Sequence, residues 1–270
     1  SSPTNVTVTQ ACACSAGTCT VGVTGTANYN GSASFQFYVS AGTGADSTTA
    51  TANLTINPVD DAATLGAIST QSTTVNNATS AIAFTFSDPD GSVCSSARLS
   101  MTSSNTTIVA NGSVTWAGTA PNCTATITPV SEKAGTVTIT ITATDGGLAN
   151  KTSSFTLNVN GAVLVWTDSA GTIITAYDFG TPGANATYPV RVRNDGNQAS
   201  GAITISNTNA TPRLSISASS CAALAVGSFC SLTLQWTNTG GGGSGLKQET
   251  YTATHASGSS SKALAVQGTK

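Results

Sequence analysis

Cysteine is the residue type of this sequence whose number and spacing most clearly suggest chemistry, either metal binding or disulfide formation. Seven cysteines are present, at Cys12, Cys14, Cys19, Cys94, Cys123, Cys221 and Cys230. The close set Cys12, Cys14 and Cys19 offers three thiols and no nearby histidine, whereas a structural zinc site takes four ligands, usually as two close pairs. We therefore expect disulfides, which form and persist in oxidising compartments.

Groups for acid–base or nucleophilic catalysis are scarce. The chain has one histidine, His255, and 11 acidic residues among its 270. No serine lies in a Gly-x-Ser-x-Gly motif, the turn that exposes the nucleophile of many hydrolases. His255 stands at the end of an apparent strand, where an ordinary surface or strand histidine is the alternative to a catalytic one. We do not expect an enzyme.

Charge and hydropathy exclude two further classes of partner. Only 7% of the residues are charged, and the formal net charge is −2. Nucleic acids and anionic membranes attract basic surfaces, so we expect neither as a partner. No apolar run approaches the roughly 20 residues that a membrane-spanning helix needs, so we expect no membrane span.

Short stretches in which apolar and polar residues alternate recur along the chain. Residues 136–142 read Thr-Val-Thr-Ile-Thr-Ile-Thr, a pattern typical of a half-buried strand. The same period occurs at residues 53–57, 81–86, 154–159, 188–192, 202–205 and 231–236. Turn-forming residues separate these runs, and no amphipathic helix pattern stands between them. The predicted class is all-β, with two or three domains at about 100–150 residues each.

The first 160 residues contain two copies of one pattern. The run from Cys19 to Thr24 aligns with the run from Cys123 to Thr128 at an offset of 104 positions. The offset also pairs Gly31 with Gly135, Phe35 with Ile139 and Phe37 with Ile141, and after a one-residue adjustment it pairs 54–57 with 157–160. The copies join near residues 57–61, Asn-Pro-Val-Asp-Asp.

The two copies differ in completeness. The first copy lacks roughly the first 40 residues of the second, which corresponds to two or three strands. A sandwich without those strands exposes an apolar face and unpaired edges. Either a longer precursor was cut or only partly observed, or a strand from another subunit completes the sheet.

The repeat also bears on the cysteines. Cys94 and Cys123 close a loop of about 30 residues within the second copy, where a disulfide or two buried thiols are the alternatives. Cys19 aligns with Cys123, but the first copy has no counterpart of Cys94. We expect Cys19 to pair with Cys12 or Cys14 instead, which leaves one thiol for a bridge between molecules.

Residues 1–160 resemble the cadherin-like and immunoglobulin-like tandem repeats of large bacterial surface adhesins. Four segments carry the resemblance: 27–35 (Ala-Asn-Tyr-Asn-Gly-Ser-Ala-Ser-Phe), 57–61, 86–91 (Phe-Ser-Asp-Pro-Asp-Gly) and 143–147 (Ala-Thr-Asp-Gly-Gly). The resemblance implies an incomplete domain at 1–58 and a complete cadherin-like domain at 59–160.

Residues 161–270 look like a different immunoglobulin-like module, the kind called choice-of-anchor or ASH-like. The resemblance is carried by 178–180 (Asp-Phe-Gly), 192–197 (Val-Arg-Asn-Asp-Gly-Asn), the segment from Cys221 to Leu234, and 265–269. It implies a cell-surface or extracellular module, and a disulfide between Cys221 and Cys230 that matches the cysteine pair of that family.

The resemblance to cadherin-like repeats also implies a calcium site. Such sites gather aspartate oxygens from the end of one domain and the loops of the next, because calcium takes six to eight oxygen ligands. The candidate ligands here are Asp60, Asp61, Asp88, Asp90 and Asp145. The alternative is that these aspartates only form turns.

Three tryptophans, Trp116, Trp166 and Trp236, are either core residues or platforms that stack on a ligand.

The chain begins Ser-Ser-Pro, which fits a processed, exported protein. We expect three sandwich domains in an elongated rod, on the cell surface or outside the cell. The expected function is that of a structural subunit of an extracellular fibre, with copies of itself as partners through strand exchange and a cell-surface or glycan target as a further candidate. The alternatives are a stalk fragment of a large repeat adhesin and a carbohydrate-binding accessory module.

Overall fold

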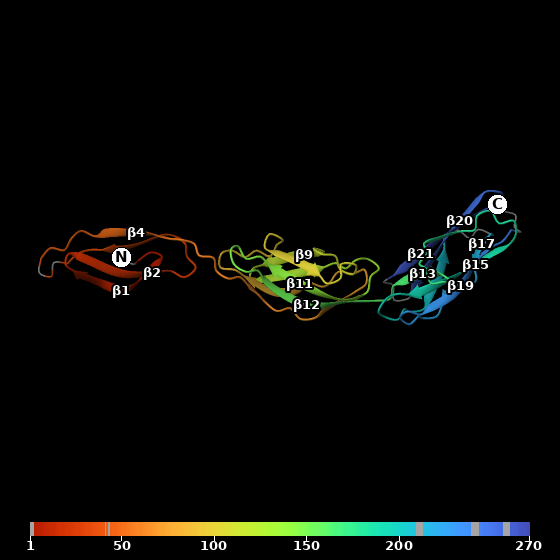
Figure 1. Ribbon diagram of the computed structural model, residues 1–270, viewed down its shortest axis with the longest axis horizontal. Helices are drawn as coiled ribbons and strands as arrows, with labels where there is room; N and C mark the ends of the chain where they lie inside the picture. The colour runs from red at the N-terminus through yellow and green to blue at the C-terminus, as the bar shows by residue number, and fades with distance from the viewer. Residues whose placement is uncertain (1–2, 41, 43, 209–212, 239–242, 256–259) are drawn as a thin grey trace.

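The computed structural model describes residues 3–40, 42, 44–208, 213–238, 243–255 and 260–270. Within these ranges the regular secondary structure consists of strands, and no helix occurs. Figure 1 shows the strands in three groups that follow one another in a row. We call these groups the first, second and third modules, residues 3–58, 59–160 and 161–270. The predicted class, all-β with tandem sandwich domains in an elongated rod, is confirmed.

The first module consists of two separate hairpins. Strand β1 (Val6–Ser15) pairs with β2 (Thr18–Gly25), and β3 (Gly31–Phe37) pairs with β4 (Ala50–Ile56). A β-bridge connects the hairpins, in which the amides and carbonyls of Thr4 and Ser34 exchange hydrogen bonds of 2.9 and 3.1 Å. The Asn5 side chain also donates to the Ser32 carbonyl over 3.3 Å. Each sheet of this module therefore has two strands.

The second module is a sandwich of two four-stranded sheets. Its strands are β5 (Thr64–Leu65), β6 (Gln71–Thr74), β7 (Ile82–Ser87), β8 (Leu99–Ser103), β9 (Val114–Thr119), β10 (Asn122–Ile127), β11 (Gly135–Ala143) and β12 (Lys151–Asn160). One sheet has the order β5-β7-β10-β9 and the other β6-β12-β11-β8. The predicted alternation is realised in β11, where Val137, Ile139 and Ile141 point into the core between the sheets.

The third module is a second closed sandwich. Its strands are β13 (Leu164–Asp168), β14 (Ala176–Asp178), β15 (Ala186–Asn194), β16 (Ile203–Asn207), β17 (Leu214–Ile216), β18 (Ser220–Cys221), β19 (Phe229–Trp236), β20 (Leu246–His255) and β21 (Ser261–Thr269). They form the sheets β13-β15-β19-β17 and β14-β21-β20-β16-β18. Trp166 and Trp236 lie fully buried in the core between these sheets.

Hydrogen bonds fix the joint between the second and third modules. The Asn197 side chain donates to the Val159 carbonyl over 3.0 Å and accepts from the Gly161 amide over 2.9 Å. The Ser260 hydroxyl donates to the Glu132 carboxylate over 2.6 Å. Backbone and side chains of both modules therefore hold β12 and β13 in a defined relation.

The strand registers show which half of the sandwich the first module contains. In the first hairpin Cys14 lies opposite Cys19, and in the second module the aligned Gly118 lies opposite Cys123. The β3–β4 register also equals that of β11–β12, since Phe37 lies opposite Ala50 where Ile141 lies opposite Ser153. Strands β1–β4 are thus the counterparts of β9–β12.

The expectation that two or three strands are missing was too low. The counterparts of four strands, β5, β6, β7 and β8, are absent from the described part of the first module. Two of these strands are only two and four residues long in the second module. Such short strands leave no alternating pattern in a sequence, which is why they were not counted.

We predict that truncation to alanine at two aligned positions has very different effects on the stability of the two copies. Ile141→Ala should destabilise the second module by roughly 2–5 kcal/mol, because a fully buried side chain is lost from a packed core. Phe37→Ala, at the aligned position, should change stability by less than about 0.5 kcal/mol, because that side chain is half exposed. Denaturant melts of the two variants, with amide exchange to assign each transition, measure both effects. Equal losses would contradict the view that the first module lacks a closed core.

Candidate functional site

The inner face of the first module is the main candidate site, because its apolar residues are uncovered. Phe37 is 49% exposed, whereas its counterpart Ile141 is fully buried, and Val21 is 36% exposed where Ala125 is fully buried. Among the described residues of this module, the buried hydrophobic side chains are Val6 and Ala33. The same pattern that closes a core in the second module therefore leaves an apolar surface here.

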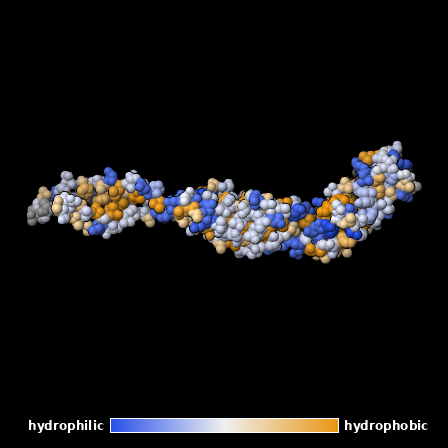
Figure 2. Space-filling model, viewed as in Figure 1, coloured by the Kyte–Doolittle hydropathy of each residue, from blue (hydrophilic) through white to orange (hydrophobic). Residues whose placement is uncertain are grey.

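This apolar surface continues past the end of β3. Tyr38 and Val39 are 60% and 64% exposed, while the residue aligned with Val39, Ala143, is fully buried. Figure 2 shows hydrophobic surface spread over the first module, at the left of the view. The sequence repeat already pairs Phe37 with Ile141, and its extension to Val39 and the end of β11 identifies the whole run. Exposed apolar patches of this kind mark interaction sites.

Three strand edges of the first module lack the neighbours that their counterparts have. In the second module β10 pairs with β7, β11 with β8, and β12 with β6. The aligned strands β2, β3 and β4 each have one paired edge in the described structure. Their other edges present backbone amides and carbonyls that can pair with an added strand.

The cysteines of the first module lie at the tip of its first hairpin. Cys14 and Cys19 form a disulfide across opposite positions of β1 and β2. Of the two partners expected for Cys19, Cys14 is therefore the one that is bonded to it. Cys12 is exposed and is the free cysteine of the described residues. Its sulfur lies within 4.8 Å of the other two, but the disulfide leaves this cluster one thiol instead of the four ligands of a structural zinc site.

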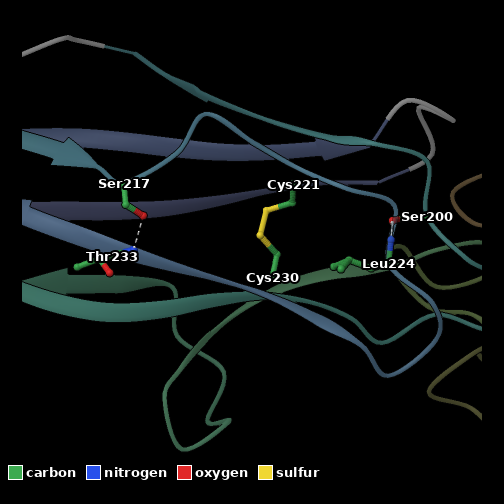
Figure 3. Close-up of a disulfide and its surroundings, with 6 residues drawn as sticks. All are labelled: Ser200, Ser217, Cys221, Leu224, Cys230 and Thr233. Atoms are coloured by element: carbon green, nitrogen blue, oxygen red, sulfur yellow. Dashed lines mark hydrogen bonds between the residues drawn. A yellow bond between two sulfur atoms is a disulfide. The ribbon is translucent and has the colours of Figure 1, made fainter.

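The other two disulfides each join a strand to another segment of the same sandwich. Cys94, between β7 and β8, is bonded to Cys123 on β10, and Cys221 is bonded to Cys230. The second of these joins β18 and β19, which belong to different sheets of the third module. Figure 3 shows that bond between two hydrogen bonds of 2.9 Å, from the Thr233 amide to Ser217 and from the Leu224 amide to Ser200.

The five aspartates expected to bind calcium come together only in part. Asp60 and Asp145 lie close enough at the joint between the first and second modules for each to shift the pKa of the other. Asp90 contributes to the charge around Asp60 and accepts a hydrogen bond from the Asp61 amide over 2.6 Å. Asp88 forms an ion pair with Arg98 through one carboxylate oxygen and accepts a hydrogen bond from the Asp90 amide over 2.9 Å with the other. Among the described residues, no three of these aspartates group as metal ligands.

Hydrogen bonds, desolvation and charge shift the pKa values of Asp60 and Asp145 in opposite directions. The Ala63 amide donates to Asp145 over 2.8 Å and the Leu148 amide over 3.2 Å, and these bonds lower the pKa of Asp145. Partial desolvation, followed by the charges of Asp145 and Asp90, raises the pKa of Asp60. Asp60 is therefore the residue at which a bound cation would relieve repulsion most, and calcium at this joint stays a prediction.

We predict that Asp60→Asn stabilises the protein at neutral pH in a chelator. The raised pKa means that ionised Asp60 costs stability, a cost that is absent in acid and arises as the pH rises through that pKa. The variant should melt slightly higher than the wild type in a chelator, and added calcium should raise the melting temperature of the wild type alone. Asp46→Asn, an exposed aspartate of the first module, is the matched control. If calcium leaves the wild-type melt unchanged, the joint binds no calcium.

The tryptophans behave as core residues. Trp166 donates from its ring nitrogen to the Lys262 carbonyl over 2.9 Å, and Trp236 packs beside Phe179. Trp116 is half-buried, meets Phe84 edge-on at 6.0 Å between ring centres, and lines an open groove of about 510 Å³. Of the three, only Trp116 reaches a surface where a ligand could stack.

His255 ends β20, as the sequence indicated, but it is buried and not a surface residue. Burial lowers the pKa of His255, while the carboxylate of Glu132, which comes from the second module, acts in the opposite direction. No sequence pattern indicates this burial, because it depends on how the third module packs and on a loop of the preceding module.

We predict that acid destabilises the third module through His255. In the unfolded chain the imidazole takes up a proton near pH 6.5, about its ordinary value, whereas the folded chain keeps it neutral to a lower pH. Stability should therefore fall as the pH drops below about 6.5. Melting the wild type and His255→Gln at pH 7.5 and pH 5 measures the effect, and parallel losses in both proteins would contradict it.

Comparisons with known proteins agree with the architecture. No family model and no curated protein matches the chain, so the choice-of-anchor resemblance of residues 161–270 stays a prediction. The ectodomain of human desmocollin-1 matches 98% of this chain and 53% of its own, with 10% identity and a TM-score of 0.50. This chain thus spans about half the length of the desmocollin chain, and the match supports the fold alone.

Two further structures match at lower scores. The D00-D0 domain of intimin covers 77% of this chain and 100% of its own, with 16% identity and a TM-score of 0.38. An endo-fucoidan hydrolase of glycoside hydrolase family 107 covers 99% and 38%, with 15% identity and a TM-score of 0.31. Both scores are too low to support an argument about function. Separately, the described residues include no helix that is both long and apolar enough to cross a membrane.

Proposed function

We propose that this chain is a structural subunit of an extracellular fibre, in which β-strands donated by a neighbouring subunit complete the first module. The observation that carries the proposal is the contrast between aligned positions of the two copies. Phe37 is half exposed where Ile141 is fully buried, in strands that share the same register. A fold that buries these positions in one copy requires a cover for them in the other.

Burial of these side chains supplies the driving force. Removing a large apolar side chain from water contributes on the order of 1.5–3 kcal/mol. Val21, Phe37, Tyr38 and Val39 are all exposed, and Phe35, Leu54 and Ile56 are only half-buried. A donated strand covers several of them at once, so its burial can offset the entropy lost when the strand becomes ordered.

The backbone fixes how an added strand pairs, and the side-chain pockets make the pairing specific. Strand addition to an open sheet edge gains main-chain hydrogen bonds, while pockets for alternate side chains select the sequence of the added strand. Both hairpins of the first module present such an edge next to the apolar face. Low charge favours close packing of subunits, since 7% charged residues and a net charge of −2 give little mutual repulsion.

The rest of the chain is suited to a spacer. Two closed sandwiches follow the first module, and hydrogen bonds of Asn197 and Ser260 fix the joint between them. The three disulfides fit an oxidising, extracellular compartment. The same features suit a stalk of a larger repeat adhesin, in which the chain itself would supply the missing strands.

A carbohydrate-binding role has less support. Two of its three candidate platforms, Trp166 and Trp236, are fully buried. The groove beside Trp116 is the one feature of the described structure that favours this role, and a change of tryptophan fluorescence on adding oligosaccharides would reveal it.

Electron microscopy of material isolated from the producing cells tests the fibre proposal. We predict long assemblies for the wild type and their loss in Phe37→Asp, because a carboxylate on the apolar face cannot be buried without a partner. Ile173→Asp is the matched control, since Ile173 is 54% exposed on the third module, and this variant should still assemble. Wild-type material that is a monodisperse monomer, or Phe37→Asp material that still forms fibres, would reject the proposal. A monomer heavier than this chain would instead favour the adhesin stalk.

A further inference from the structure

We propose that the donated segment carries a cysteine that displaces Cys14 from the Cys14–Cys19 disulfide and becomes bonded to Cys19. This inference rests on the proposed function, to which it adds a covalent step and the chemistry of the partner. It follows from the alignment of the two copies, which gives Cys19 a different partner in a complete module from the one that it has here.

The second module shows what that partner is. Cys19 aligns with Cys123, and each is the second residue of its strand. Cys123 is bonded to Cys94, with 5.4 Å between their Cα atoms. Cys94 belongs to the connection between β7 and β8, within the four-strand segment that the first module lacks. The counterpart of Cys94 would therefore arrive with the donated strands.

The present partner of Cys19 occupies a position that holds no cysteine in the complete copy. Cys14 aligns with Gly118, and the register at this point is the same in both hairpins. A Cβ atom at Gly118 would lie 2.4 Å from the Asn122 carbonyl oxygen, so the complete module tolerates no side chain there with its present backbone. The Cys14–Cys19 bond is thus particular to the incomplete copy.

Accessibility singles out this disulfide for exchange. Cys14 and Cys19 are both exposed, whereas Cys123 and Cys221 are 1% and 7% exposed and shield the other two bonds. Thiol–disulfide exchange requires a thiolate to reach one sulfur of the bond, so a thiol from outside reacts first at the exposed pair.

The donated segment should resemble β7 and the connection that follows it in the second module. Ile82, Phe84 and Phe86 point into the core of the second module, and Phe84 lies opposite Cys123. A strand of this pattern, antiparallel to β2, would place its central aromatic residue opposite Cys19. The second module already uses its own segment of this pattern, so the donated segment is a further one of the same chemistry, which the proposed function assigns to a neighbouring polypeptide.

The exchange needs no oxidant. The thiolate of the incoming cysteine attacks Sγ of Cys19, a new S–S bond forms, and the bond between Cys19 and Cys14 breaks. The electron pair leaves with Sγ of Cys14, which then takes up a proton. One disulfide is consumed and one is formed, and Cys14 joins Cys12 as a thiol.

A peptide of residues 81–103 serves as the probe, because it contains β7, Cys94 and β8 of this chain. It is added to the folded protein without oxygen or other oxidant, and the mixture is acid-quenched for intact mass and disulfide mapping. We expect a mass increase of one peptide per chain, a bond from the peptide cysteine to Cys19, and an alkylatable Cys14. The protein variant Cys12→Ser should react in the same way, which excludes Cys12 as the site.

Two peptide variants separate the steps. Cys94→Ser should protect the amides of β2 and β3 from exchange without a covalent adduct. Phe84→Asp should form the adduct no faster than a small thiol does, because it cannot dock. An adduct at Cys12 or Cys14, or none at all, would overturn the covalent step. If Cys94→Ser peptide still protects β2 in that case, strand acceptance survives; if it protects neither strand, the proposed function fails as well.

Discussion

The structure depends on one constraint: an alternating strand buries its apolar side chains only if a second sheet faces it. In the second module, β11 contributes Ile139 and Ile141 to a core that strands of both sheets close. The first module repeats the strands but has two per sheet, and Phe37 remains half exposed. Local alternation makes the strands, whereas the number of strands decides whether a core exists. The proposed role follows from that distinction, because the first module exposes apolar side chains at positions that a complete module buries in its core.

Much of the fold can be predicted from the sequence, because alternation and repetition are local or periodic signals. The offset of 104 positions, with its one-residue adjustment before β4, anticipates strand registers that the structure realises in both hairpins. Strands β5 and β6 escape prediction, since two and four residues are too few to show a period. The arrangement of the third module, with β14 and β21 parallel in one sheet, depends on contacts between distant segments that no period encodes.

The candidate site is predictable to a smaller extent. Composition and the repeat indicate that Cys19 has lost its partner, but the choice of Cys14 over Cys12 requires the register that sets Cys14 opposite Cys19. Turn motifs place the aspartates in loops, yet they do not reveal that Asp88 forms an ion pair with Arg98. The burial of His255 likewise arises from packing that joins two modules, and a sequence pattern describes one strand at a time.

The disulfides differ in what they constrain. Cys221–Cys230 ties the two sheets of the third module together, and Cys94–Cys123 anchors the connection by which the chain crosses from β7 to β8. Cys14–Cys19 joins opposite residues of strands that are already paired, so it adds nothing between the two sheets of its module. The described part of the first module therefore has neither a closed core nor a covalent link between its sheets, and the Thr4–Ser34 bridge with the Asn5–Ser32 hydrogen bond is a weak substitute for both. Under the proposed function, a donated strand supplies the contacts that the first module lacks, so completion of the module and assembly of the fibre would be one event.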